Sequence, residues 1–361
     1  FDLALSINKL IGSGTPVSER KRLAIEMFER GNSKGVVEIL NEKDIAADAA
    51  QARKEIEQGK LLVDFGRSLI EAGLQKTRSL AEEYVLRAKA LMTDYAEPRR
   101  FELACHAYEQ GIELIRANLS EEELAKSLFE YGCFLQTNKR YDLAEARYRE
   151  NLDICQRLAA ISPQAYEPSL AMTQYNLGCL YSDTQRYEDS EKMYLSAMEI
   201  RRRLAVANPQ VYEPDLADTQ YNLGCLYYNI QRYEDSEEMY LSALEVYQRL
   251  TAVNPQVYEP YLVRACNNLS FLFLAQGNFE EAERYAREGS KYDFTHHTIY
   301  TNLVASLLLQ GRYAEAEEIY LRYKEELKED FLSDFEDFYR RGIIPPERED
   351  DVERIKKLLS K

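Results

Sequence analysis

The chain has 361 residues, of which 45% are hydrophobic and 30% are charged, and its formal net charge is −16. These proportions are typical of an ordered, soluble protein, and the length exceeds that of one ordinary compact domain unless the chain is an elongated array. The negative charge argues against nucleic acid and membrane as partners, since both are bound through basic surfaces. No apolar run approaches the ~18 residues of a membrane span, and no signal peptide is visible. Because the chain begins at Phe1, we expect it to be part of a longer or processed protein.

The first part of the chain, residues 1–78, is predicted to be a helical region. Between Asn41 and Tyr84 the sequence contains no proline and is densely charged. We therefore expect one or two long helices here, packed lengthwise on the helices that follow.

The next part, residues 79–325, repeats itself. The segments FEYGCFL, YNLGCLY, YNLGCLY and NNLSFLF begin 46 residues apart, at Phe129, Tyr175, Tyr221 and Asn267, and TNLVASL follows from Thr301. Each is followed by a second segment with a small residue four places before a tyrosine or alanine: Ala144 and Tyr148, Ser190 and Tyr194, Ser236 and Tyr240, Ala282 and Ala286, Ala316 and Tyr320. Apolar residues spaced by three and four indicate helices, so each unit is a helix pair that must stack on its neighbours.

This pattern resembles the tetratricopeptide repeat, whose usual length is about 34 residues. The longer copies resemble the lengthened repeats of kinesin light chain and of bacterial multi-repeat proteins. The resemblance is clear over residues 120–325, fair from about Ser79 to Ala117 and weak from Arg22 to Leu40, where a degenerate repeat is expected. It implies about five repeats in an all-α fold: a right-handed α-solenoid of stacked antiparallel helix pairs, with long N-terminal helices and a C-terminal helical cap.

Prolines recur between the helix pairs. Pro163, Pro209 and Pro255 are expected to end one helix, and Pro168, Pro214 and Pro260 to begin the next, where a missing amide proton costs nothing.

The last part, residues 326–361, is predicted to contain two capping helices. FLSDFEDFYRRG places Phe331, Phe335 and Phe338 on one helical face and ends at Gly342. DDVERIKKLL then places Val352, Ile355, Leu358 and Leu359 at helical spacing. A docking helix for another protein is the alternative to a cap.

Two copies are nearly identical, and their differences favour one face. Residues 166–198 and 212–244 agree at 26 of 33 places. Three of the seven differences, Met172 to Asp218, Ser182 to Tyr228 and Asp183 to Asn229, follow one side of the first helix. The resemblance implies that this side lines the concave groove of the superhelix.

On this side of the first helix, an asparagine recurs in four repeats. An amide both donates and accepts, so we expect these asparagines to form a ladder that binds the backbone of an extended peptide; the alternative is that each bonds to the neighbouring repeat. The expected groove residues are Lys126, Phe129, Glu130, Met172, Tyr175, Asn176, Asp218, Tyr221, Asn222, Tyr228, Asn229, Arg264, Asn267, Asn268, Phe271 and Asn302. Arg264 with Asn222 and Asn268 resembles part of the carboxylate clamp of chaperone-binding relatives, but the lysine one turn earlier is replaced, so a chaperone-tail receptor is not expected.

No catalytic or metal-binding pattern stands out, so we expect no enzymatic activity, no metal and no cofactor. The adjacent His296 and His297 lack the spacing of a shared zinc site. Cysteines one repeat apart, such as Cys179 and Cys225, should lie about 10 Å from each other, beyond the ~7 Å limit for a disulfide. They indicate free thiols in a reducing compartment, and we expect a cytoplasmic, bacterial protein.

The predicted function is therefore that of a scaffold whose groove binds an extended segment of a protein partner. The alternative is a structural or regulatory array that forms homo-oligomers through residues 1–75 or controls a fused effector domain.

Overall fold

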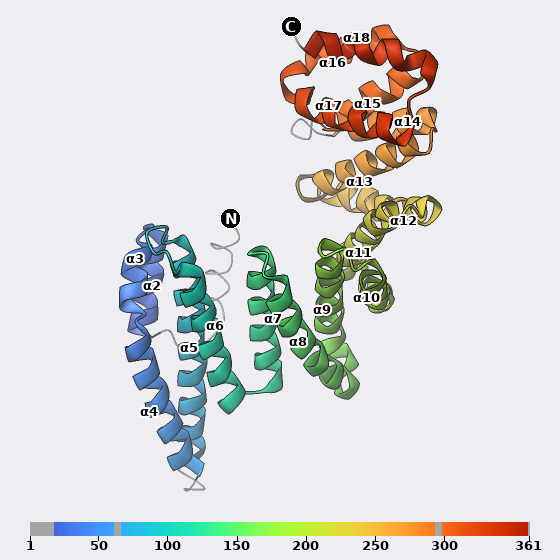
Figure 1. Cartoon of the computed structure of the whole chain (residues 1–361). Coiled ribbons are helices and arrows are strands. Elements are labelled where there is room, and N and C mark those ends of the chain that lie inside the picture. The colour runs from blue at the N-terminus through green and yellow to red at the C-terminus, as the bar shows by residue number, and fades with distance from the viewer. Residues whose placement is uncertain (1–17, 61–65, 293–297, 360–361) are drawn as a thin grey trace. The chain divides into compact units, whose positions relative to one another are not determined.

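The computed structural model describes residues 18–60, 66–292 and 298–359, and none of these residues lies in a strand. The regular elements are helices that pack in chain order, which confirms the predicted all-α solenoid (Figure 1). The chain forms two compact units, Phe1–Tyr166 and Glu167–Lys361, and each is described by itself. Residues 1–17 of the predicted N-terminal region, and His296 and His297, lie outside the described part of the chain.

The first unit contains the expected long helices, α4 and α5, after two shorter ones. α5 packs against α4 on one side and α6 on the other, so it runs along the helices that follow it, as predicted (Figure 1). The helices of this unit are α2 (Glu19–Glu29), α3 (Ser33–Ile39), α4 (Glu42–Lys60), α5 (Gly66–Thr93), α6 (Arg100–Asn118), α7 (Glu121–Thr137) and α8 (Tyr141–Ile161).

The second unit consists of helix pairs followed by C-terminal helices. The first helices of the pairs are α9 (Pro163–Asp183), α11 (Pro209–Asn229), α13 (Pro255–Ala275) and α15 (Thr298–Leu309). The second helices are α10 (Tyr187–Ala207), α12 (Tyr233–Val253), α14 (Phe279–Gly289) and α16 (Tyr313–Arg322). The chain ends with α17 (Lys324–Arg341), the short 3₁₀ helix η1 (Pro346–Arg348) and α18 (Glu349–Leu359).

Two of these pairs, α9–α10 and α11–α12, close on a glycine of the first helix. The ring of Tyr194 packs over Gly178, where an added Cβ would lie only 2.6 Å from the ring, and Tyr240 covers Gly224 in the same way. Ser190 Oγ donates a hydrogen bond of 2.8 Å to the Gly178 carbonyl oxygen. The small and aromatic residues predicted to set the helix spacing therefore do so, because only glycine leaves room for the ring.

The expectation for the repeated prolines is wrong. Pro209 and Pro255 occupy the first turn of their helices and begin them, and Pro163 is likewise the first residue of α9. Pro168, with its equivalents one and two repeats later, lies inside the helix. Proline fits at a helix start because its missing amide proton has no partner there. The interior proline removes one hydrogen bond to the carbonyl four residues earlier, but that residue, Gln164 in α9, is exposed and water can satisfy its oxygen.

The C-terminal helices form as predicted. Gly342 ends α17 in the left-handed conformation, with φ of 68°, and the three phenylalanines of α17 are completely buried. Val352 and Ile355 of α18 are also buried, whereas the side chains of Leu358 and Leu359 lie outside the described residues. α17 packs on α15 and α16, and α18 packs on α17.

Candidate functional site

Polar and aromatic side chains line one side of the first helices in the second unit. We call this set, Tyr175 of α9, Asp218, Tyr221 and Asn222 of α11, and Arg264 and Asn268 of α13, the first-helix face. Tyr175, Asp218, Asn222 and Asn268 are half-buried, Tyr221 is buried and Arg264 is exposed. Because α9, α11 and α13 are consecutive first helices, equivalent positions recur once per repeat.

The asparagines of this face already make hydrogen bonds within the fold. Asn222 Nδ2 donates to the Tyr175 hydroxyl at 2.6 Å, and Asn268 Nδ2 donates to the Tyr221 hydroxyl at 2.8 Å. Each bond reaches back to the preceding repeat, as the alternative interpretation of the ladder expected. Within the described residues, the amide oxygens of Asn222 and Asn268 accept no hydrogen bond. Each amide oxygen therefore remains available to accept a hydrogen bond.

The other two asparagines of the predicted ladder have different surroundings. Asn176 Nδ2 donates to the Met172 carbonyl oxygen of its own helix at 2.9 Å. Asn302 is buried and donates to the carbonyl and side-chain oxygens of Asn267, both at 3.0 Å. The sequence thus does not produce four equivalent amides: the repeat shortens before Asn302, and Asn176 bonds within its own helix although its spacing is regular.

The two similar copies differ in a pair of touching residues. In the earlier copy, Met172 Sδ accepts from Arg201 Nη2 at 3.7 Å. In the later copy, Asp218 Oδ1 accepts from the Tyr247 hydroxyl at 2.7 Å. Arg201 and Tyr247 occupy equivalent positions of α10 and α12, so a change in the first helix is matched by a change in the second. Sequence reasoning missed Arg201 and Tyr247 because the compared stretch ended before them.

Two arginines give this face positive charge. Arg201 is 3% exposed and donates to the Asp215 carbonyl oxygen at 2.8 Å and to Thr219 Oγ1 at 2.7 Å, while its guanidinium lies 4.5 Å from the Tyr175 ring centroid. Arg264 lies 4.6 Å from the Tyr221 ring centroid. Neither makes an ion pair with a carboxylate among the described residues.

Burial shifts the ionisation of the groups beside these arginines. It lowers the pKa of Arg201 itself and raises the pKa of Asp218, against the hydrogen bond from Tyr247. It also raises the pKa of Tyr221 to about 12, so this hydroxyl stays protonated near neutrality. The face therefore offers hydrogen-bond donors and acceptors, two aromatic rings and an unpaired cation, which suits binding of a peptide.

Three of the expected groove residues belong to the first unit. Lys126 forms an exposed ion pair with Glu122 at 2.6 Å, and the Phe129 ring lies 5.9 Å from that of Tyr148. Glu130 forms an ion pair with Lys89. These three side chains belong to the first unit, whereas the first-helix face belongs to the second.

Three further expected residues lie toward the C-terminal ends of α11 and α13. Asn229 is exposed, whereas Tyr228 and Phe271 are half-buried, with ring centroids 5.7 Å apart. Arg341 of α17 donates from Nη1 to the Tyr228 hydroxyl at 2.8 Å. Burial raises the pKa of Tyr228 to about 12. The chain's own α17 thus lies against two of the residues expected to line the groove, Tyr228 and Phe271.

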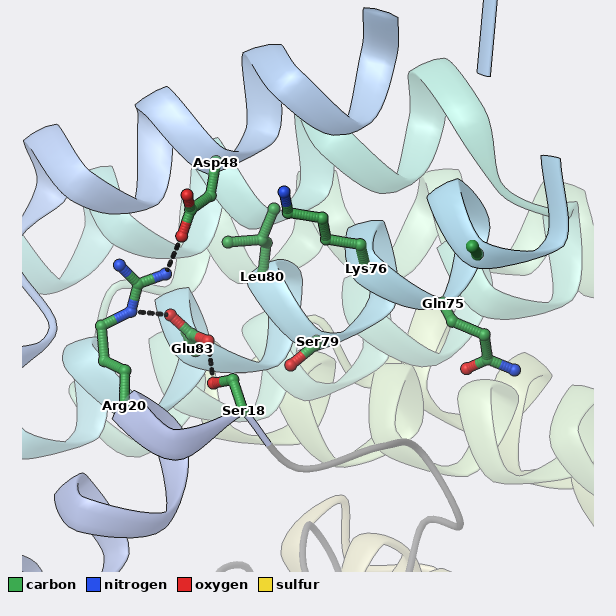
Figure 2. A pocket seen from close by; sticks show the side chains of 9 residues that line it. Ser18, Arg20, Asp48, Gln75, Lys76, Ser79, Leu80 and Glu83 are labelled. Carbon is green, nitrogen blue, oxygen red and sulfur yellow. Dashed lines mark hydrogen bonds and ion pairs between the residues drawn. The ribbon is translucent and has the colours of Figure 1, made fainter. Parts of the chain in front are cut away.

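A pocket of about 440 Å³ lies in the first unit between α2, α4 and α5 (Figure 2). Arg20 joins its walls through ion pairs to Asp48 at 2.6 Å and Glu83 at 2.7 Å, and Ser18 Oγ donates to Glu83 at 2.7 Å. Glu83 is 1% exposed, whereas the side chains of Arg20 and Asp48 are 21% and 45% exposed, so only the Glu83 end of this network is shielded from water. Its evident role is to fasten α2 to the two long helices, since breaking a buried pair leaves an uncompensated charge.

Two further features of the described residues concern metal-ligating groups and helices that could cross a membrane. Over residues 18–60, 66–292 and 298–359, no group of three or more histidine, cysteine, aspartate or glutamate side chains is placed to hold a metal ion. No helix in the same ranges has the length and apolar character required to cross a membrane.

Sequence comparison identifies the repeat. Sequence models described as tetratricopeptide repeat match residues 169–249 and 262–289. A comparison with curated proteins found no match.

Comparison with solved structures finds similar folds at low identity. BtubC (BKLC) from P. vanneervenii is 20% identical with a TM-score of 0.51, over 69% of this chain and 90% of that one. The apo form of RapI is 13% identical with a TM-score of 0.55, over 100% and 98% of the two chains. Aspartyl phosphate phosphatase F from Bacillus subtilis is 15% identical with a TM-score of 0.54, over 99% and 91%. These likenesses concern the fold alone.

Proposed function

Because the chain is a tetratricopeptide-repeat protein, and such repeats generally form non-catalytic scaffolds that bind protein partners, we propose that it binds an extended segment of a protein partner along the first-helix face. The observation that carries this proposal is the pair of amides, Asn222 and Asn268, each held in place by a tyrosine of the preceding repeat while its oxygen makes no hydrogen bond within the described residues. An amide oriented in this way is prepared to accept a backbone N–H without losing further side-chain freedom.

The spacing of the first helices sets the length of the segment. Packed helices lie about 8–10 Å apart, so α9, α11 and α13 span roughly 20 Å. An extended chain advances ~3.3 Å per residue, and a segment of about six residues therefore covers the face. Backbone contacts at Asn222 and Asn268 would supply affinity, while Tyr175, Tyr221 and Arg264 would select side chains.

A random-peptide display selection against the full chain tests this proposal. Peptides selected on the wild-type chain are measured by calorimetry against the Asn222→Ala, Asn268→Ala double variant. We expect the double variant to bind at least about ten-fold more weakly, since each lost hydrogen bond contributes on the order of 1 kcal/mol. Gln248→Ala is the matched control, because it removes an exposed amide from the second helix α12.

Thermal unfolding separates binding from folding, since the double variant also removes the donors to Tyr175 and Tyr221. A double variant that unfolds like the wild type and binds the selected peptides equally well would contradict the proposed role of the amides.

Three broader parts of the prediction remain proposals. They are the domain boundaries at residues 78 and 325, the formation of homo-oligomers through residues 1–75, and a cytoplasmic location. Six free cysteines, Cys105, Cys133, Cys155, Cys179, Cys225 and Cys266, support a reducing, cytoplasmic location.

A further inference from the structure

The contacts of α17 extend beyond those of an ordinary cap. A helix that continued the stack would pack on α15 and α16, the last helix pair, and α17 does so. It also reaches α13, where Phe338 lies 5.5 Å from the Phe271 ring, and α11, where Arg341 bonds to Tyr228. The latter contact joins residues 113 positions apart. α17 therefore lies across the first helices of three successive pairs.

An unbroken series of aromatic contacts holds α17 in this position. Phe331 lies 5.3 Å from Tyr320 of α16, Phe335 lies 4.3 Å from Phe331, and Phe338 lies 5.6 Å from Phe335. The series continues through Phe271 to Tyr228. We call α15 together with Tyr228, Phe271 and Tyr320 the α17 docking surface.

At the C-terminal end of α17, the contact with the α17 docking surface is polar and exposed. Besides its hydrogen bond to Tyr228, Arg341 pairs with Asp337 of its own helix at 2.7 Å, and its side chain is 37% exposed. The bond to Tyr228 thus competes with water, unlike the buried phenylalanines. α17 is joined to α16 through Tyr323, so an α17 displaced from this surface would remain tethered to the chain.

The difference between the similar copies supports a specific role for this contact. Tyr228 stands where the preceding copy has Ser182, a residue that has no aromatic ring. The ring and hydroxyl of Tyr228 meet Phe271 and Arg341, and both Tyr228 and Phe271 are residues that the sequence assigned to the groove. The side chain that distinguishes this copy is therefore used to receive a helix.

We propose that the α17 docking surface is an exchangeable site for an amphipathic helix with aromatic side chains at positions i, i+4 and i+7, and that α17 occupies it until a partner's helix of this kind replaces it. The occupant in the free chain shows the chemistry of the partner: three buried aromatic rings followed by a basic residue one turn later. This site is separate from the amides of the first-helix face and does not depend on them.

A peptide of residues 324–341, labelled with a fluorophore, tests the proposal on the full chain. In the wild-type chain the tethered α17 competes at an effective concentration on the order of mM, so the free peptide binds weakly. In the Phe338→Ala chain the tethered helix loses its contact with Phe271, and we expect the wild-type peptide to bind at least about ten-fold more tightly, as measured by fluorescence anisotropy.

Three controls define the site. Adding Tyr228→Ser to the Phe338→Ala chain should remove most of the gain, since it replaces the receiving residue by the one in the preceding copy. A labelled peptide that itself carries Phe338→Ala should bind no chain well. The Asn222→Ala, Asn268→Ala changes should leave peptide binding intact, which separates this proposal from the proposed function.

Arg341→Ala provides a second test if Phe338→Ala prevents folding. It removes only the exposed contacts with Tyr228 and Asp337, so a smaller gain in peptide affinity is expected with an unchanged circular dichroism spectrum. If neither variant binds the labelled peptide more tightly than the wild-type chain, α17 is a fixed cap and the proposal is overturned.

Discussion

The helix pairs α9–α10 and α11–α12 share one interior and present different surfaces. Gly178 and Gly224 receive Tyr194 and Tyr240 at the same distance, and Ser190 and Ser236 bond to the respective glycine carbonyl oxygens at 2.8 Å. On the first-helix side, however, a methionine beside an arginine is replaced by an aspartate beside a tyrosine. The comparison teaches that closure of the helix pair strictly constrains the glycine, the serine and the tyrosine. On the first-helix side, by contrast, a residue and its contact on the second helix differ together between the two copies.

Adding a methyl group at either glycine tests whether the interiors are equivalent. Gly178→Ala and Gly224→Ala would each place a Cβ 2.6 Å from a tyrosine ring. We expect each change to lower the free energy of unfolding by about 1–3 kcal/mol, because the ring must move from a close-packed position. Urea unfolding of both variants measures this, with Gln248→Ala as an exposed control. Costs that differ by much more than about 1 kcal/mol would show that the interiors differ.

Exchanging the contacting pair tests whether the first-helix residue and its second-helix partner change together. Asp218→Met leaves the Tyr247 hydroxyl without its acceptor and should cost about 1–3 kcal/mol of stability. Combining it with Tyr247→Arg recreates the pair of the preceding copy, and we expect a coupling of about 0.5–3 kcal/mol in a double-mutant cycle. Recovery should be incomplete, since Ala265 stands where Thr219 receives Arg201. Additive effects of the two changes would contradict the pairing.

The smallest expected effect is a difference between the two copies in how their stability depends on pH. Burial raises the pKa of Asp218 above its ordinary value of 3.8, so the folded chain holds this proton more tightly than the unfolded chain. The resulting stabilisation is fully present below pH 3.8 and is lost as the pH rises through the raised pKa. The stability of wild type relative to Asp218→Asn should therefore fall as the pH rises, then become constant.

The preceding copy supplies the control for this experiment. Met172 cannot titrate, so the stability of wild type relative to Met172→Leu should not change with pH. Urea unfolding in matched buffers measures the stability of wild type relative to Asp218→Asn at each pH. If this stability difference stays constant or rises with pH, burial does not hold Asp218 in the protonated form.

Much of the fold could be predicted because its signals are local. Apolar residues at spacings of three and four place the helices, and the recurring glycine, small residue and tyrosine specify which helices pair and how closely. The proline error has a local cause as well. Pro163 and Pro168 are both compatible with a helix start, and the exposure of Gln164, which lets the inner proline be tolerated, is known only from the folded chain.

The candidate site could be predicted only in part. Periodicity placed Asn222 and Asn268 on the same side of their helices, but it did not show that their donors are already engaged by Tyr175 and Tyr221. Nor did it indicate Arg201, which belongs to the second helix α10 and bonds to residues of the first helix α11. Hydrogen-bond partners depend on the separation of two helices, which the spacing within one helix does not contain.

The sequence by itself determined the helix pairs, their repetition and the buried phenylalanines of α17, since each follows from contacts within one helix or between consecutive helices. Only the tertiary structure decided which residues of the expected groove α17 covers. The contact between Arg341 and Tyr228 joins positions 113 residues apart, and its geometry depends on the packing of all the helices between them.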